Sequence, residues 1–231
     1  MVSQILSHPQ YSKTVSNLER TVVRDKLARL VQYFSRFLSY YAYRKGFSAE
    51  VVSQLKAISG YFSLSRKIFR LGKPIGLFRA VIRELSNHTG SRVKHYANLG
   101  RNVGQFGFLG LDGLILLQLV GAHKFKPAQL KTIQTYSNRF WLLSMVSNIV
   151  DAAYSSYVET LRIRALSQDV DSSDDEFKLA TTERKKQLTV LIWNIVDTVI
   201  PSTALGLVAG NDGICGLAGT FTSYLGLLQA W

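Results

Sequence analysis

The sequence lacks the residue patterns that most catalytic and metal sites require. Cys215 is the only cysteine among 231 residues, which excludes an internal disulfide and a cysteine-based zinc site. His8, His88, His95 and His123 share no metal-ligand spacing. No G-x-x-x-x-G-K-[ST] phosphate loop and no G-x-S-x-G nucleophile elbow occurs. We therefore expect no enzyme, no metal and no cofactor.

The sequence also has little strand character, because alternation is weak and β-branched runs are short. Apolar residues instead recur three and four apart, which is typical of amphipathic helices. The spacing predicts helices over about 21–44, 49–71 and 74–85. We predict an all-α, membrane-associated protein with basic amphipathic helices in its N-terminal part and hydrophobic or transmembrane helices in its C-terminal part.

Acidic residues are scarce in the N-terminal part of the chain. Residues 1–100 hold 17 Lys and Arg against four Asp and Glu, whereas residues 101–231 hold 11 of each. The whole formal net charge of +13 therefore lies in the first hundred residues. Such asymmetry favours an anionic partner, either nucleic acid or lipid. No zinc-finger or RNP pattern supports nucleic acid, and the apolar C-terminal part favours a membrane, so we expect no nucleic-acid partner.

Residues 64–85 carry the strongest functional pattern. Seven apolar residues recur at steps of four and three and share one stripe of a helix: Leu64, Ile68, Leu71, Ile75, Phe78, Ile82 and Leu85. Six basic residues accompany them: Arg66, Lys67, Arg70, Lys73, Arg79 and Arg83. An apolar stripe beside a cationic face suits a helix that lies in the headgroup region of an anionic phospholipid membrane. The alternative is a surface helix packed on the protein's own core.

Pro74 lies inside this segment, between Gly72 and Gly76. Proline has no amide hydrogen for the carbonyl of Arg70, so we expect a kink or break there. The two halves of the segment are then free to insert unequally into a membrane.

Four later segments approach the length of about 20 residues that crosses a bilayer: 103–122, 140–158, 188–209 and 213–231. The first and last rank highest as membrane spans, and glycines at three- and four-residue spacing within them suit close helix packing. We predict four regions: a basic amphipathic region at 1–91, a hydrophobic helical region at 92–166, an acidic linker at 167–182 and C-terminal hydrophobic helices at 183–231. The linker is expected to be solvent-exposed and disordered. Ser172 and Ser173 precede acidic residues there and are candidate phosphorylation sites.

Three stretches resemble the eleventh peroxin family, whose members elongate the peroxisomal membrane. Residues 66–74 (Arg-Lys-Ile-Phe-Arg-Leu-Gly-Lys-Pro) are similar to the family signature, residues 26–37 to its N-terminal helix, and the glycine-spaced segment ending in Trp231 to its C-terminal membrane segment. The resemblance implies a peroxisomal membrane protein with both termini facing the cytosol. It also implies insertion of the basic amphipathic helix, tubulation of the membrane, promotion of peroxisome fission and proliferation, self-association, and recruitment of a dynamin-related GTPase.

A different function stays open at this point. A pore for small metabolites would use the glycine-rich segments together with Asp112, Asp151 and Asp197, each of which stands alone in an apolar stretch. Residues 1–10 show no basic start followed by an apolar run, so no secretory signal peptide is expected.

Overall fold

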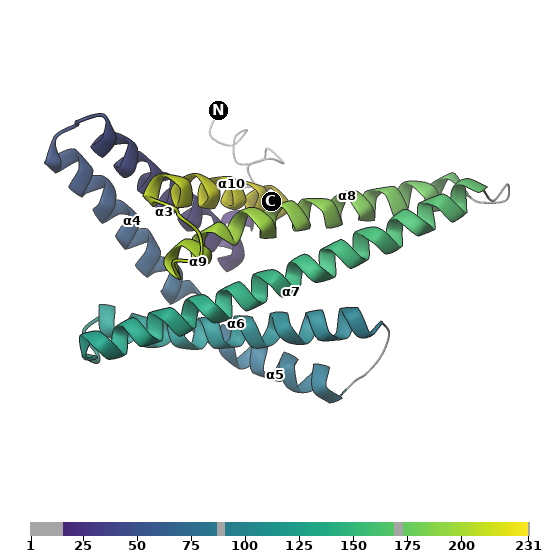
Figure 1. Cartoon of the computed structure of the whole chain (residues 1–231), viewed down its shortest axis with the longest axis horizontal. Coiled ribbons are helices and arrows are strands. Elements are labelled where there is room, and N and C mark those ends of the chain that lie inside the picture. Colours follow the sequence, from purple (N-terminus) through teal and green to yellow (C-terminus); the bar gives the residue numbers. More distant parts are fainter. Residues whose placement is uncertain (1–15, 87–90, 169–172, 231) are drawn as a thin grey trace, which may run out of the picture. The chain divides into compact units, whose positions relative to one another are not determined.

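The computed structural model describes residues 16–86, 91–168 and 173–230, and the ordered elements within these ranges are helices (Figure 1). The all-α prediction is therefore confirmed. The chain divides into two compact units. Unit 1 comprises Met1–Leu71 and Ala209–Trp231, and unit 2 comprises Gly72–Val208. This division differs from the four consecutive regions expected from the sequence, because the C-terminal helix joins the N-terminal ones.

In unit 1, α3 (Thr21–Arg44) packs against both α4 (Ala49–Phe69) and α10 (Asp212–Ala230). Gly46 lies just after the end of α3 and has a φ of 75°, which only glycine adopts without strain. Ser48 caps the next helix, and its side chain accepts a hydrogen bond from the amide of Val51. The sequence-predicted helices at 21–44 and 49–71 are therefore present with nearly the expected bounds.

The α3–α10 contact depends on glycine. A Cβ atom added at Gly216 would lie 2.6 Å from the backbone nitrogen of Phe37, so the two helices approach at backbone distance. Polar contacts fix both ends of the pair: Arg36 and Asp212 form an ion pair at 2.7 Å, and Arg20 donates to the carbonyl of Ala230 at 3.0 Å. The two helices are therefore antiparallel.

Unit 2 consists of α5 (Lys73–Ser86), α6 (Arg92–Leu119), α7 (Pro127–Gln168), α8 (Asp174–Asp197) and α9 (Val199–Ala204) among its described residues. The 42 residues of α7 span about 63 Å at 1.5 Å per residue. Figure 1 shows α7 alongside α6 over one part of its length and alongside α8 over the other. α5 packs on α6, and α9 contacts α7 and α8.

Glycine also brings α6 against α7. A Cβ atom at Gly104 would lie 2.6 Å from the backbone nitrogen of Ser144 and 2.8 Å from the carbonyl oxygen of Phe140. Beside this contact, Gln105 donates to the Ser144 hydroxyl at 2.9 Å, and the rings of Phe108 and Trp141 stack with centroids 5.2 Å apart. The helix seam is thus built from small residues with aromatic rings at its side.

Gly104→Ala is expected to lower the free energy of unfolding by about 1–3 kcal/mol, because the new methyl group meets backbone atoms that cannot rotate away. Gly110→Ala is the matched control: it lies on the same helix with open space around its position, and should stabilise the protein by about 0.5–1 kcal/mol. Thermal unfolding in a non-ionic detergent, followed by circular dichroism, measures both. A Gly104→Ala protein as stable as the parent would contradict a close backbone contact between α6 and α7 at this position.

No helix within the described ranges has both the length and the hydrophobicity to cross a membrane. The predicted spans at 103–122 and 213–231, and the transmembrane part of the fold prediction, are therefore not supported. The physical reason is that both segments carry small and polar residues where they pack on other helices. Gly104 contacts α7, Gly216 contacts α3, and Asp112 and Thr222 are buried within their units.

Within the acidic segment at 167–182, the described residues 167–168 and 174–182 are helical, which corrects the prediction of a disordered linker for that part of the segment. α7 continues through Gln168, and α8 begins at Asp174. Ser173 caps α8 by accepting from the amide of Glu176 at 3.3 Å, and the acidic first turn favours the positive end of the helix dipole. The Ser-x-x-Glu spacing was the overlooked signal of a helix start.

Candidate membrane-binding surface

The sequence-predicted amphipathic segment at 64–85 is divided between the two units. α4 ends at Phe69, and α5 begins at Lys73. Gly72 has a φ of 82°, so the chain turns just before Pro74, where a kink or break was expected. The apolar residues that the sequence placed on one continuous stripe are therefore divided between two helices, with Leu71 in the turn that joins them, and each part has its own surroundings.

The part of the segment on α5 has solvent-exposed apolar side chains. Four residues at helical spacing, which we call the α5 stripe, have side chains 49–77% exposed: Ile75, Phe78, Ile82 and Leu85. None of the residues of this helix is buried. An exposed row of large apolar side chains is costly in water and indicates a surface that something apolar covers.

The basic residues of α5 border this stripe. Arg79 and Arg83 follow Ile75 at successive steps of four residues, and both are exposed. Lys73 is exposed at the start of the helix. The helix therefore presents apolar and cationic groups side by side on its outer surface, as an interfacial helix requires.

Among the described elements, α5 contacts only α6. The rings of Phe78 and Phe106 lie 5.6 Å apart, and Nδ1 of His95 lies 3.5 Å from a carboxylate oxygen of Glu84. Because no residue of α5 is buried and its contacts are with a single helix, we expect local opening of unit 2 to involve α5 early.

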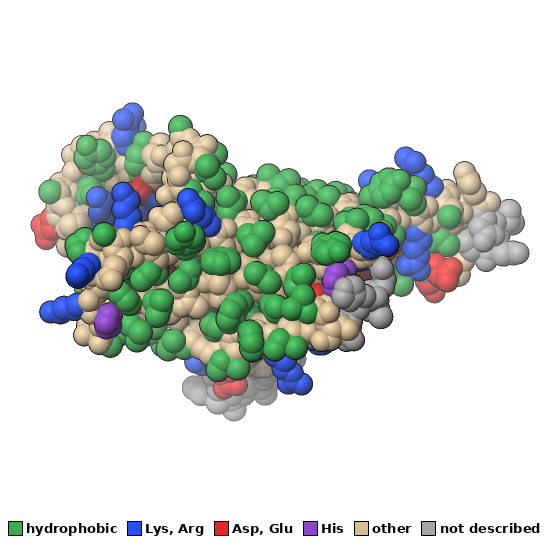
Figure 2. Space-filling view, turned by 60° about the horizontal axis from the view of Figure 1, so that its bottom comes forward, with side chains coloured by type: hydrophobic (Ala, Val, Ile, Leu, Met, Phe, Trp, Pro, Cys, Tyr) green, Lys and Arg blue, Asp and Glu red, His purple; other side chains and the backbone are tan. Residues whose placement is uncertain are grey.

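The apolar surface continues from α5 onto α6 through the Phe78–Phe106 contact. Phe106, Leu114 and Leu117 are exposed at helical spacing, and open space surrounds Gly110 between them. Figure 2, which turns the α5 side forward, shows hydrophobic side chains spread across that face. Sequence reasoning assigned these residues to a membrane span. Their recurrence at steps of four and three was the signal that one side of α6 faces outward.

The part of the segment before Gly72 is less exposed. Ile68 and Leu71 are exposed, whereas Leu64 and Lys67 are half-buried. Arg70 is also half-buried, with Nε 3.8 Å from Asp25 and donating to the carbonyl of Arg66 at 3.0 Å. This half offers fewer groups to a membrane than α5 does.

Arg66 is buried, contrary to the expectation that it faces lipid headgroups. Its Nε lies 3.3 Å from an Asp25 oxygen, and its Nη1 donates to the side chain of Gln32 at 2.6 Å. Burial, with Arg70 and Arg29 nearby, lowers the Arg66 pKa from its ordinary value to about 10, so the guanidinium still carries its charge at neutral pH. Its partner Asp25 is one of the few acidic residues of the N-terminal region. That isolated acid was the sequence signal that one of the basic residues is paired within the protein.

Ser172, one of the two candidate phosphorylation sites, lies outside the described residues. Ser173 is described, and its hydroxyl oxygen accepts the capping hydrogen bond of α8. Of the three aspartates considered for a pore, Asp112 and Asp197 are buried within unit 2, and Asp151 is half-buried on α7.

Sequence comparison relates the chain to proteins of the peroxisomal membrane. A family model described as peroxisomal biogenesis factor 11 (PEX11) matches residues 11–231. The chain is 26% identical to peroxisomal membrane protein PMP30B of Candida boidinii, covering 99% of this chain and 96% of that protein. It is 26% identical to PMP27 of Saccharomyces cerevisiae (98% and 97% covered) and 25% identical to peroxisomal membrane protein 11A of Homo sapiens (90% and 92% covered). No solved structure matches the chain.

Proposed function

Because this chain belongs to the PEX11 family of peroxisomal biogenesis factors, we propose that it remodels the peroxisomal membrane by inserting α5 into one leaflet. Its relatives are named as peroxisomal membrane proteins, which supports the same membrane for this chain. The observation that carries the mechanism is the α5 stripe, exposed beside Arg79 and Arg83.

The energies are sufficient for stable binding. Burial of a large apolar side chain contributes about 1.5–3 kcal/mol, and the four stripe residues are about half exposed, so covering them contributes about 3–6 kcal/mol in total. Lys73, Arg79 and Arg83 each add about 1 kcal/mol at an anionic surface. Insertion of the stripe requires no change in the packing of α5 on α6, because the four stripe side chains are already exposed.

The proposed mechanism is a wedge. A helix that lies at the depth of the headgroups widens one leaflet relative to the other, and the bilayer relieves the difference by curving. The neighbouring face of α6, with Phe106, Leu114 and Leu117, broadens the inserted surface. Tubulation of the membrane would then precede peroxisome fission and proliferation.

Other parts of the proposal rest on family resemblance. They are self-association, recruitment of a dynamin-related GTPase, and orientation of both termini toward the cytosol. Phosphorylation at Ser172 or Ser173 also stays a proposal. At Ser173 a phosphate would replace the cap of α8 beside three acidic residues, and mass spectrometry of the native protein tests this directly.

Arg79→Gln/Arg83→Gln is expected to weaken binding of the full-length chain to anionic vesicles about 30-fold at low salt. The reason is that two headgroup contacts of about 1 kcal/mol each are removed. The apolar part of the interaction is unchanged, so the difference should shrink as salt screens the charges. Vesicle flotation across a salt series measures the effect.

Arg162→Gln/Arg164→Gln provides the matched control, because it removes two exposed arginines near the end of α7 and the same net charge. Its binding should stay within a few-fold of the parent. If both double variants lose affinity equally, total charge rather than the α5 surface drives binding.

A further inference from the structure

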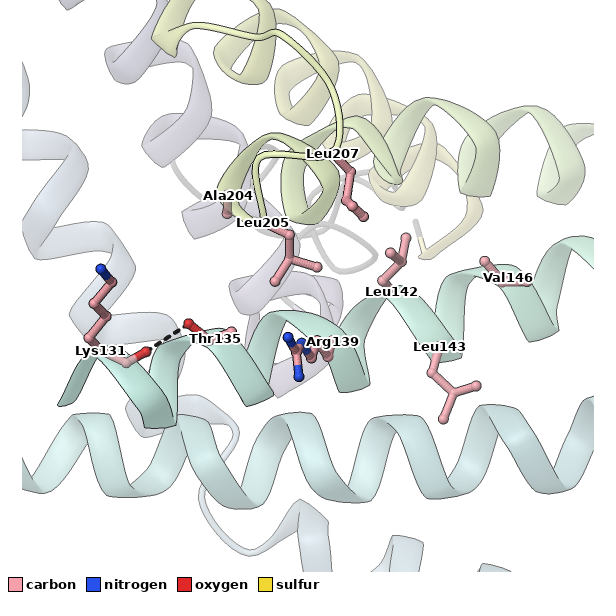
Figure 3. Close-up of a pocket in the computed structure, with 9 residues that line it drawn as sticks. All are labelled: Lys131, Thr135, Arg139, Leu142, Leu143, Val146, Ala204, Leu205 and Leu207. Atoms are coloured by element: carbon pink, nitrogen blue, oxygen red, sulfur yellow. Dashed lines mark hydrogen bonds between the residues drawn. The ribbon is translucent and has the colours of Figure 1, made fainter. Parts of the chain in front are cut away.

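A groove in unit 2 lies between α7 and the segment formed by α9 and the residues after it (Figure 3). Its volume is about 560 Å³, within the range of about 300–1,000 Å³ typical of small-molecule sites. This groove is separate from α5, so an inference about it is independent of the proposed function.

One wall of the groove changes character along α7. Lys131, Thr135 and Arg139 follow each other at steps of four and line one end. Leu142, Leu143 and Val146 line the other end from the next turn of the same helix, and the Leu142 side chain points toward the α9 segment (Figure 3). The wall is therefore cationic over about two turns and apolar over about one further turn, which is the polarity of a lipid with an anionic headgroup.

The opposite wall is apolar. Ala204, Leu205 and Leu207 line it, and Figure 3 shows the side chains of Leu205 and Leu207 reaching toward α7. Leu143 and Leu207 are 42% and 66% exposed, so the groove opens to the surface and its hydrocarbon side chains are incompletely covered. An acyl chain between these walls would remove that surface from water.

The cationic end has no acidic neighbour in the groove, since the described lining residues include neither Asp nor Glu. The guanidinium of Arg139 lies over the Tyr136 ring, 5.3 Å from its centre, which orients the charged group. The Thr135 hydroxyl already donates to the carbonyl of Lys131 at 2.9 Å. Recognition of an anion therefore falls to Lys131 and Arg139.

We propose that this groove binds a single-chain lipid with a phosphate monoester headgroup, of the lysophosphatidic acid class. Lys131 and Arg139 each lie one helical turn, about 6 Å along the axis, from Thr135, so a phosphate held beside Thr135 is within the length of both side chains. Two cations match the near-double charge of a phosphate monoester better than the single charge of a carboxylate. One apolar stretch accommodates one acyl chain.

The test uses the full-length chain in a non-ionic detergent and lysophosphatidic acid with a photoreactive group in its acyl chain. We expect crosslinks in the peptides that contain residues 142–146 and 205–207. Unlabelled lysophosphatidic acid should compete at least tenfold better than zwitterionic lysophosphatidylcholine or a fatty acid of the same chain length. Equal competition by the three lipids overturns the headgroup assignment.

Lys131→Glu/Arg139→Glu should reduce labelling at least tenfold, whereas Arg184→Glu/Lys185→Glu, which reverses two exposed charges on α8, should leave it unchanged. Leu142→Trp, which enlarges a side chain that points toward Leu205 and Leu207 (Figure 3) without changing charge, should also reduce labelling. Crosslinks outside the groove, or labelling that survives both groove variants, overturn the proposal. Crosslinks obtained only from a photoreactive diacyl phosphatidic acid in bilayers also overturn it, because the groove would then face membrane lipid.

Discussion

Replacement of Ile75, Phe78 and Ile82 by glutamate is expected to abolish the tubulation of anionic vesicles by the full-length chain. The triple variant removes three of the four side chains of the α5 stripe and places three negative charges against an anionic surface. The loss of apolar burial and the added repulsion together exceed the attraction of the remaining cations. Electron microscopy of vesicles after reconstitution measures tubule number and length.

The structure supplies a matched control for this variant. Leu188, Ile192 and Ile195 on α8 are also exposed at helical spacing, so their replacement by glutamate changes apolar content and charge equally. Tubulation should persist in that control. Because all six positions are exposed, both variants should retain the parent's helical circular dichroism. Undiminished tubulation by the α5 variant would rule out insertion of α5.

A further comparison separates the two halves of the segment at 64–85. Ile68→Glu/Leu71→Glu changes the two clearly exposed apolar residues on the unit 1 side of the break. We expect a smaller loss of tubulation than from Ile75→Glu/Phe78→Glu, because Arg66 and Arg70 on that side are engaged with Asp25. A larger loss from Ile68→Glu/Leu71→Glu would assign the wedge to unit 1 instead.

Asp25→Ala is expected to cause the largest loss of stability, about 3 kcal/mol at the lower end of the range for broken buried ion pairs. The Arg66 side chain is only 10% exposed. Without Asp25 its guanidinium still donates to the side-chain oxygen of Gln32 but has lost its carboxylate partner. The neighbouring Arg70 loses the same partner. Thermal unfolding should show a fall in melting temperature of about 6–12 °C.

Asp212→Ala is the matched control, since it removes an aspartate that pairs with an arginine of the same helix α3. That pair is exposed, at 35% for Arg36 and 54% for Asp212, and exposed pairs contribute about 0–1 kcal/mol. Replacing both buried partners, in Asp25→Leu/Arg66→Met, should recover much of the lost stability because no unpaired charge remains. Equal effects of Asp25→Ala and Asp212→Ala would contradict a buried pair.

The candidate membrane surface was only partly predictable from the sequence. The spacing of Ile75, Phe78, Ile82 and Leu85 identified the residues of the α5 stripe, because one helix face is encoded by steps of three and four. The same pattern could not tell whether that face is covered by other helices. It also treated Arg66 and Arg79 as equivalent, although one is buried against α3 and the other is exposed.

The sequence by itself determined the helical class, the two helices on either side of Gly72, and membership in the PEX11 family. These properties depend on local propensity, periodicity and short motifs, all of which are written in neighbouring residues. Only the tertiary structure decided that α10 packs on α3, that Gly104 and Gly216 serve helix contacts, and that Asp25 turns Arg66 inward. Those outcomes depend on which distant side chains meet, and hydropathy along the chain does not specify such pairing.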